Sequence, residues 1–257
     1  MADAPSPGLV VGRIGALDHV SLDAPERRNA LSIAMLDAIR DVAHRSANDE
    51  RSRGLVLDHT GDVFSAGVDL VERRELPPGA RNHSQALADL YRALWAYPKP
   101  LLCRVDGAVR GGGLGLVVAA DVVVAGSRAT FAFTEVRVGV APALVGALAM
   151  ARSGASRLAP WLLSGRTLDA ARAAEVGLVT ELVDDDGAAV VADWCSSIEQ
   201  AAPRAQQVTK ALTRRLVAID VPALLEEMEV LSAEMFDGPE AREGMAAFAE
   251  RRPPSWA

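Results

Sequence analysis

Short strand-forming runs alternate with amphipathic helical runs over the first half of this chain, and this alternation constrains the fold more than any other feature. After Ser32, a suitable N-cap, the apolar residues Ile33, Leu36 and Ile39 fall on one helical face. Strands that alternate with helices pair in parallel, so the sequence predicts an α/β protein. The expected strands are 9–14, 16–22, 54–60, 101–107 and 121–126, and the expected helices are 33–45, 84–97 and 114–120.

Strand signals stop at about residue 197, and the rest of the chain is predicted to be helical. Leu, Met and Phe side chains follow the faces of these helices, and apolar helices at the end of a chain often dock on another subunit. We therefore expect a core over residues 1–196 and a C-terminal helical region over residues 197–257. The three expected helices are 202–218, 221–236 and 238–252.

The composition is that of a soluble globular protein, with half of its 257 residues apolar and 24% charged. The net charge of −7 argues against nucleic acid as a partner, because phosphate backbones favour basic surfaces. The segment Met1–Gly8 lacks the features of a secretory signal, and the longest charge-free apolar stretch, Val138–Ala151, is too short to span a bilayer. We therefore expect a cytoplasmic protein without a membrane segment.

Three segments carry residues suited to chemistry: Phe64–Leu70, Arg110–Gly115 and Phe133–Gly139. The glycine run in the second segment fits neither the dinucleotide-binding nor the P-loop pattern. It allows two readings: a tight turn with close helix–strand packing, or a helix N-terminus whose backbone N–H groups approach a negatively charged ligand oxygen. The turn at Ala66–Val68 offers a second backbone donor for such an oxyanion hole.

These segments, taken in order, resemble the enoyl-CoA hydratase/isomerase (crotonase) superfamily. The resemblance spans nearly the whole chain and implies an α/β fold, a crotonase-type spiral of ββα units with a C-terminal helical trimerisation region. It also implies an acyl-CoA substrate, no cofactor beyond the coenzyme A of the thioester, and a homotrimer or a dimer of trimers. The segments that carry it are PERRNAL (25–31), FSAGVDL (64–70), VDGAVRGGGLGL (105–116), FTEVRVGV (133–140), 162–183 and 243–256.

The resemblance assigns roles to particular residues of this chain. The amides of Val68 and Gly112 would bind the thioester oxygen, and Glu135 would be the catalytic acid–base. An ion pair with Arg137 is the alternative reading for Glu135. The implied coenzyme A-binding residues are Arg28, Ala30, Ala66, Asp69, Leu70, Phe248 and Arg251, the last two reached from a neighbouring subunit.

Phe248 and Arg251 also have simpler readings, as a core side chain and as a solvated cation at a helix end. Metal chemistry is not expected, because the cysteines and histidines show no metal-binding spacing. The residues concerned are Cys103, Cys195, His19, His44, His59 and His83.

One position departs from the family pattern. Typical hydratases carry a first glutamate where this chain has Gly115, twenty residues before Glu135. Three readings remain: hydration by Glu135 alone, with a branched, carboxylated enoyl-CoA as one substrate option; Δ3,Δ2-enoyl-CoA isomerisation, which needs a single base; or acyl-CoA binding without turnover. We take the hydratase as the working hypothesis. Substitute acids or bases could come from a charged flap, at Asp69, Glu72, Glu75 and His83, and Ala143, Leu144 and Val145 would make a bulky apolar wall.

Overall fold

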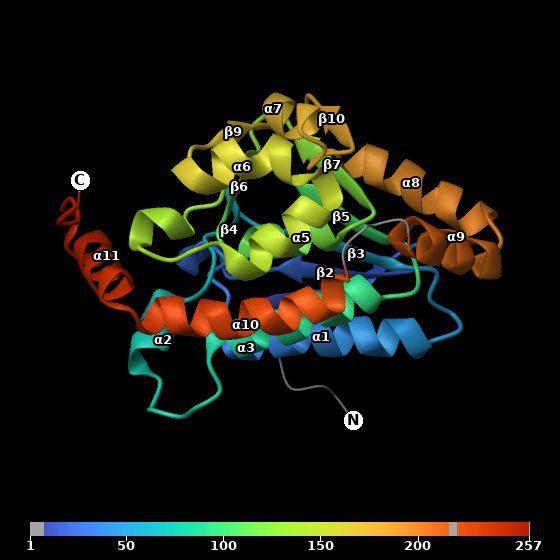
Figure 1. The fold of residues 1–257 in the computed structure, drawn as a ribbon. Coiled ribbons are helices and arrows are strands. Elements are labelled where there is room, and N and C mark those ends of the chain that lie inside the picture. Colours follow the sequence, from blue (N-terminus) through green and yellow to red (C-terminus); the bar gives the residue numbers. More distant parts are fainter. Residues whose placement is uncertain (1–7, 216–219, 257) are drawn as a thin grey trace.

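The protein is described by a computed structural model that covers residues 8–215 and 220–256 (Figure 1). Most of the segment Met1–Gly8 and the end of the helix expected at 202–218 lie outside these described residues. Within them, no helix is both long enough and apolar enough to cross a bilayer.

The larger of two sheets has six strands, in the order β1-β2-β3-β5-β7-β10. β1 and β2 form an antiparallel pair around Gly15, and all other neighbours pair in parallel, as the alternation predicted. All five residues of β3 are buried, which is typical of a parallel strand covered on both faces. The strands are β1 (Leu9–Ile14), β2 (Leu17–Leu22), β3 (Leu55–His59), β5 (Leu101–Val105), β7 (Val122–Gly126) and β10 (Glu181–Val183).

The smaller sheet has four short strands, in the order β4-β6-β8-β9, which the sequence analysis did not foresee. Three of them are the next strands in the chain after β3, β5 and β7. The chain therefore passes three times from a strand of the larger sheet to a strand of the smaller one. Because β4, β6 and β8 are parallel, their carboxyl ends meet at one edge. The strands are β4 (Val63–Ser65), β6 (Ala108–Arg110), β8 (Thr130–Ala132) and β9 (Leu168–Asp169).

The helices of the core begin at caps that the sequence supplies. Ser32 accepts a hydrogen bond from the Met35 N–H, as predicted, and Asn82 forms a capping box with Gln85. The boundary expected at residue 196 falls inside α8. The helices are α1 (Ile33–Asn48), α2 (Leu70–Glu75), α3 (His83–Ala96), α4 (Gly113–Ala119), α5 (Ala143–Ser153), α6 (Ala155–Ser164), α7 (Ala170–Glu175), α8 (Ala188–Gln200) and the 3-10 turns η1 (Pro25–Arg27) and η2 (Glu135–Val138).

The C-terminal region consists of α9 (Pro203–Arg215), α10 (Val221–Asp237) and α11 (Pro239–Glu250), as predicted. α10 lies across α3 and α5, and α11 contacts η2 (Figure 1). Glycines allow that second contact, since a Cβ at Gly244 would lie 2.5 Å from the Val138 carbonyl carbon. Helix α11 therefore packs against the segment that carries Glu135.

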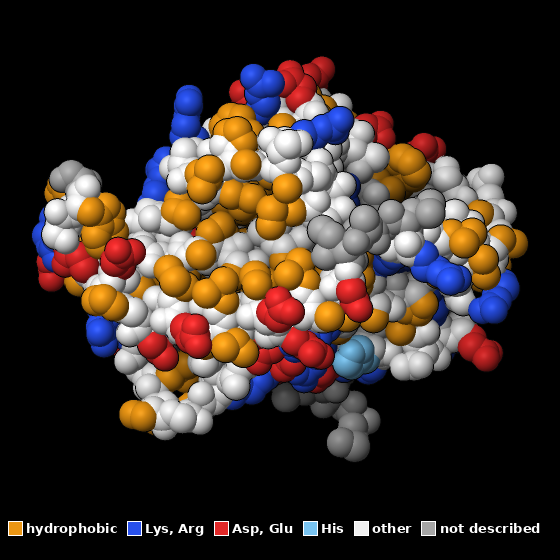
Figure 2. Space-filling model, viewed as in Figure 1, with side chains coloured by type: hydrophobic (Ala, Val, Ile, Leu, Met, Phe, Trp, Pro, Cys, Tyr) orange, Lys and Arg blue, Asp and Glu red, His pale blue; other side chains and the backbone are white. Residues whose placement is uncertain are grey.

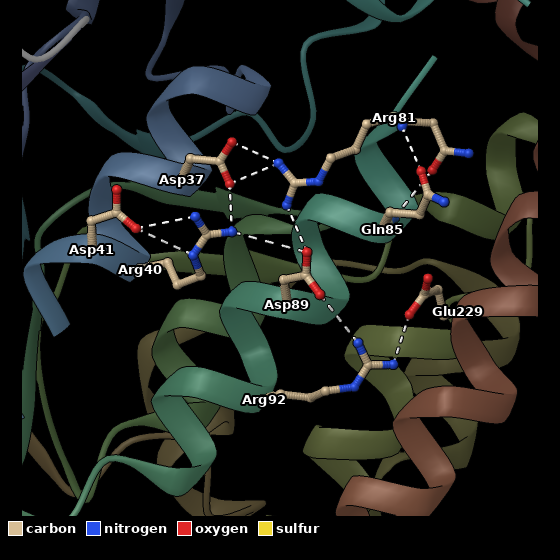
Figure 3. A network of polar contacts seen from close by, with 9 residues as sticks. Asp37, Arg40, Asp41, Arg81, Gln85, Asp89, Arg92 and Glu229 are labelled. Carbon is tan, nitrogen blue, oxygen red and sulfur yellow. Dashed lines mark hydrogen bonds and ion pairs between the residues drawn. The ribbon is translucent and has the colours of Figure 1, made fainter. Parts of the chain in front are cut away.

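A polar network fastens α10 to the core from outside (Figure 3). Arg81 of the α2–α3 loop bridges Asp37 of α1 and Asp89 of α3, at 2.6 and 2.7 Å. Arg92 of α3 then reaches Glu229 of α10 at 2.7 Å. Each partly exposed pair contributes little alone, but together they join three helices.

Apolar side chains also remain on the surface of α6 and α10. Leu163 is 80% exposed, and Val230 and Leu231 are exposed on α10. Figure 2 shows hydrophobic side chains gathered over α5, α6 and α10 on the face toward the reader. These helices thus carry apolar surface that the single chain leaves uncovered.

Candidate active site

A cavity of about 830 Å³ opens at the edge where β4, β6 and β8 end. The three segments singled out in the sequence all contribute to its wall, together with α3, α5, α10 and α11. A cavity of this size suits a small-molecule ligand. Of the predicted site residues, it brings together Arg28, Ala30, Ala66, Val68, Asp69, Leu70, Gly112, Glu135 and Phe248.

The Val68 amide lies in a turn whose neighbouring amides are already used. The Gly67 N–H donates to the Ser65 hydroxyl at 3.1 Å, and the Asp69 N–H donates to the Leu31 carbonyl at 3.0 Å. The Val68 N–H, between them, makes no hydrogen bond to any described residue. Gly67 has a φ of +92°, a conformation that favours glycine. The turn therefore leaves one donor unpaired at the cavity wall.

The glycine run supplies a second unpaired amide. The Gly111 N–H donates to the Ala132 carbonyl at 3.1 Å, whereas the Gly112 N–H has no acceptor within residues 8–215 and 220–256. Gly112 is the N-cap of α4, so its amide points out of the helix end. A Cβ at Gly67 would lie 3.6 Å from the Gly112 nitrogen, which puts the two turns in contact. Both amides border the same part of the cavity.

Glu135 begins η2, three residues after β8 ends. Gly139, with a φ of +76°, ends this short turn. The Glu135 side chain reaches back toward the glycine run, because a Cβ at Gly111 would lie 3.5 Å from its Oε1. Its Oε2 is buried and has no hydrogen-bond partner in the described part of the chain. The ion pair with Arg137, weighed as an alternative, does not form.

The surroundings of Glu135 favour a proton on its carboxyl group. Burial raises its pKa from 4.5 to about 7, and a backbone hydrogen bond of its own offsets part of this rise. Leu87, Val140, Leu144 and Val145 line the cavity. A carboxyl group whose pKa lies near neutral pH can both accept and donate a proton.

The loop expected to bind coenzyme A is fastened to the Val68 turn. The Ala66 N–H donates to the Arg28 carbonyl at 3.0 Å, and the Leu31 N–H to the Gly67 carbonyl at 2.8 Å. The buried Asn29 amide anchors this loop to the Thr60 and Val63 carbonyls. Arg28 and Ala30 thereby face the same cavity as Val68.

Arginines gather at the cavity despite the negative net charge of the protein. Burial lowers the pKa of Arg110, and the positive charges of Arg28 and Arg137 lower it further. Clustered positive charge of this kind favours an anionic ligand, and two of these arginines already have carboxylate partners, Arg27 in Asp69 and Arg252 in Glu243. The arginines that line the cavity are Arg27, Arg28, Arg110, Arg137 and Arg252.

The flap brings one further acid to the cavity wall, but its carboxylate is already engaged. Its first residue, Asp69, lines the wall, but its carboxylate caps α2 and pairs with Arg27. Glu72 accepts a hydrogen bond from the Ile33 N–H and lies 2.9 Å from the Nε2 of buried His83. Among the described residues, Glu72, His83 and Glu75 do not line the cavity. Asp69, Glu72 and His83 thus have structural partners.

The C-terminal helix meets the cavity of its own chain. Phe248 lines the rim and is 66% exposed. Arg251, the left-handed cap of α11, is not part of the described wall, where Arg252 lies instead. That both residues serve a neighbouring subunit stays a prediction.

Tyr91 is the site residue that the sequence reasoning missed. It follows Leu87 by four residues on α3 and reads as part of an apolar helical face. In the structure it is fully buried and touches the cavity. Its hydroxyl donates to the Gly112 carbonyl at 2.5 Å. A Cβ at Gly115 would lie closer than 3.0 Å to its ring. Tyr91 therefore fills the space beside residue 115, the position where typical hydratases carry their first glutamate.

No group of three or more His, Cys, Asp or Glu side chains in the described ranges is arranged to hold a metal ion. The cavity wall presents the Val68 and Gly112 amides, the Glu135 carboxyl group and the Tyr91 side chain.

The chain matches known proteins over nearly its full length. The family model for enoyl-CoA hydratase/isomerase matches residues 14–257. A 2,3-dehydroadipyl-CoA hydratase of Escherichia coli K12 is 30% identical over 250 residues, which cover 96% of this chain and 98% of that protein. A crystal structure of an enoyl-CoA hydratase from Mycobacterium avium covers 97% of this chain and 99% of its own, at 34% identity and a TM-score of 0.85. An enoyl-CoA hydratase/isomerase from Pseudoalteromonas atlantica T6c has a TM-score of 0.88 at 28% identity, over 97% of this chain and 100% of its own.

These matches agree with the architecture described above, in which two mixed sheets are followed by C-terminal helices. They confirm both the fold class and the family that the sequence motifs indicated. The chain belongs to the enoyl-CoA hydratase/isomerase (crotonase) superfamily of enzymes.

Proposed function

We propose that this protein adds water to the double bond of a 2-enoyl-CoA thioester, with Glu135 as the single carboxylate that moves protons. The observation that carries the proposal is the Glu135 carboxyl group, whose Oε2 is buried and unpaired among the described residues. It lies beside two turns that each leave one amide without an acceptor. Its pKa of about 7 suits proton transfer near neutral pH.

The two amides would hold the thioester carbonyl. As water attacks the β-carbon, electrons move toward the carbonyl oxygen, which gains negative charge as an enolate forms. The N–H groups of Val68 and Gly112 are already fixed by neighbouring hydrogen bonds, so they need no reorganisation to bind that oxygen. Each such donor contributes about 3–4 kcal/mol to the transition state.

One carboxylate is sufficient for the proton balance. The water oxygen bonds to the β-carbon while Glu135, as the carboxylate, takes a proton from the water. The protonated Glu135 then gives a proton to the α-carbon, and the carboxylate is restored. The net change is one water added across the double bond.

The lining of the cavity suits an acyl-CoA ligand. Its apolar side chains suit a hydrocarbon acyl chain, and its arginines suit the phosphates of coenzyme A. The Escherichia coli relative is named as a 2,3-dehydroadipyl-CoA hydratase, which makes a carboxylated acyl chain a candidate here too.

Δ3,Δ2-enoyl-CoA isomerisation is the second candidate, and Gly115 is the observation that favours it. Moving a proton between the α and γ carbons needs one base, and Asp69, the other acid in the described wall, is engaged as a cap.

The test is to supply crotonyl-CoA and a 3-enoyl-CoA separately and to identify the products by mass spectrometry. A mass gain of one water from crotonyl-CoA supports hydration. Migration of the 3-enoyl double bond without water uptake supports the isomerase instead. Binding of both thioesters with neither product would leave an acyl-CoA-binding protein. The Glu135→Gln variant is the negative control.

We further propose a homotrimer or a dimer of trimers. The apolar side chains exposed on α6 and α10 support an assembled state. Light scattering coupled to size-exclusion chromatography measures the mass in solution, and a monomeric mass would contradict this proposal.

A further inference from the structure

The three consecutive glycines pose a physical problem for an oxyanion hole. Glycine has more backbone freedom than any other residue, so a run of three is poorly fixed by its own geometry. A donor that must meet a developing charge needs a fixed direction before the reaction. Some external group has to hold this run in place.

Backbone hydrogen bonds supply part of that restraint. The Gly111 N–H donates to the Ala132 carbonyl of β8 at 3.1 Å. The Leu114 and Gly115 amides donate to the Gly111 and Gly112 carbonyls at 3.0 and 3.1 Å. These bonds fix the run to β8 and to the first turn of α4.

The remaining restraint comes from a side chain. The Tyr91 hydroxyl donates to the Gly112 carbonyl at 2.5 Å, and the whole side chain is buried. Burial, with a contribution from the negative charge of Glu135, raises the pKa of Tyr91 well above 10, so the phenol keeps its proton at any working pH. One turn earlier on α3, Leu87 packs on the same glycine, 3.2 Å from where a Cβ of Gly112 would lie.

The position of the Tyr91 ring depends on Gly115. A Cβ at residue 115 would lie closer than 3.0 Å to Cζ, Cε1 and the hydroxyl oxygen of Tyr91. Glycine inside a helix costs about 0.5–1 kcal/mol relative to alanine, yet it is the only residue that leaves room for the phenol here. The ring and the glycine are therefore one packing unit.

We propose that Tyr91 is a positioning residue that acts through Gly112: its hydrogen bond holds the glycine run so that the Gly112 N–H meets the thioester oxygen, and Gly115 makes this possible. The inference rests on the proposed use of the Gly112 amide in the reaction. In this inference Gly115 has a function of its own, which is to leave room for the Tyr91 ring, and does not only mark the absence of a glutamate.

The Tyr91→Phe variant removes the hydroxyl and keeps the ring. Two reactions are followed with it: hydration of crotonyl-CoA, and exchange of the α-hydrogens of butyryl-CoA for deuterium in D₂O. Exchange needs Glu135 and the enolate but no attack by water on carbon. We expect both rates to fall by the same factor, about tenfold, because the amide is misdirected rather than lost, and loss of a whole donor costs about 10²–10³-fold.

Two further readouts separate positioning from a merely structural role. The KM for the thioester should change less than about twofold, and the pH midpoint of kcat/KM should stay near 7, where Glu135 titrates. The Tyr97→Phe variant is the matched control, because the Tyr97 hydroxyl lies 2.7 Å from the Ser46 hydroxyl, is also buried, and is not part of the described cavity wall. It should lose stability without losing rate.

The Gly115→Ala variant tests the packing unit. Its methyl group should displace the ring and lower both rates, and adding Tyr91→Phe should then change them less than about twofold. Independent, multiplicative effects would contradict the inference. Tyr91→Phe at wild-type rates would overturn it, and so would a loss of hydration with exchange intact, since Tyr91 would then act on the water. Absence of exchange and of turnover in the wild-type protein would instead contradict the proposed function.

Discussion

Two acidic side chains line the cavity in the part of the chain that the structure describes, and they belong to two similarly built regions. Asp69 follows β4, and Glu135 follows β8, which are strands of the same small sheet. Each acid lies at the start of a helical turn. The Asp69 carboxylate accepts bonds from the Val71 and Glu72 amides and pairs with Arg27, whereas the Glu135 Oε2 has no such partner.

Burial at the sheet edge does not by itself make an acid available for proton transfer. Both side chains are placed by the same topology, but amides and an arginine hold the Asp69 carboxylate, whereas the Glu135 Oε2 has no donor among the described residues. A carboxylate that several donors engage contributes to the stability of the fold. A carboxyl group without donors costs stability, which is typical of groups kept for function.

The largest expected effect comes from removing the charge of each acid in turn. Glu135→Gln should lower the rate of crotonyl-CoA hydration about 10³-fold, because general acid–base catalysis typically contributes about 10²–10⁴-fold. Asp69→Asn should lower it less than about threefold, since asparagine still caps α2. Steady-state absorbance assays at pH 7 measure both. Full activity in Glu135→Gln would reverse the roles assigned to the two acids.

The pH dependence of stability gives the next largest effect. The folded-state pKa of Glu135 is raised, from 4.5 to about 7, so the native protein binds more protons than the unfolded chain between these values. The contribution of Glu135 to the free energy of unfolding is therefore full below pH 4.5 and is lost as the pH rises to about 7. The loss should amount to about 3 kcal/mol.

Urea unfolding from pH 4.5 to 8 measures this loss. Glu135→Gln should lack that component of the pH dependence, whereas Asp69→Asn should keep it. Parallel curves for wild type and Glu135→Gln would show that Glu135 titrates alike in both states.

Truncating Asp69, the acid that caps α2, should lower the stability of the fold. Asp69→Ala removes the cap of α2 and the partner of Arg27, and we expect a loss of about 2 kcal/mol in the free energy of unfolding. Chemical denaturation measures it, with Glu75→Ala on the same helix as the control. A change below about 0.5 kcal/mol would mean that the cap contributes little.

The smallest effect concerns the rim of the cavity, far from either acid in the sequence. Phe248→Ala should raise the KM for acyl-CoA about three- to fivefold with kcat unchanged, because an exposed aromatic ring on a ligand contributes about 1 kcal/mol. Mixing this variant with Glu135→Gln protein tests whether the ring serves its own chain. Recovery of the wild-type KM in mixed oligomers would favour a neighbouring site.

Local sequence was a good guide where local physics decides the structure. Ser32 capped the predicted helix, Gly15 turned the predicted hairpin, and the apolar parallel strands lay where alternation indicated. The strands β4, β6 and β8 of the smaller sheet were not predicted, because each has only three residues. A strand of that length is too short to show a hydrophobic periodicity.

For the site, the sequence determined which groups can take part: two glycine-bearing turns, a lone Glu135 and a Gly115 without a side chain. Only the tertiary structure decided which of them are available. It engaged Asp69 in a cap, left the Glu135 Oε2 without a partner among the described residues, and brought Tyr91 from α3 onto Gly112, 21 positions away in the chain. The physical reason is that a hydrogen bond or a steric clash depends on distances between elements, and the periodicity of one helix, in which Tyr91 looks like any core residue, does not contain them.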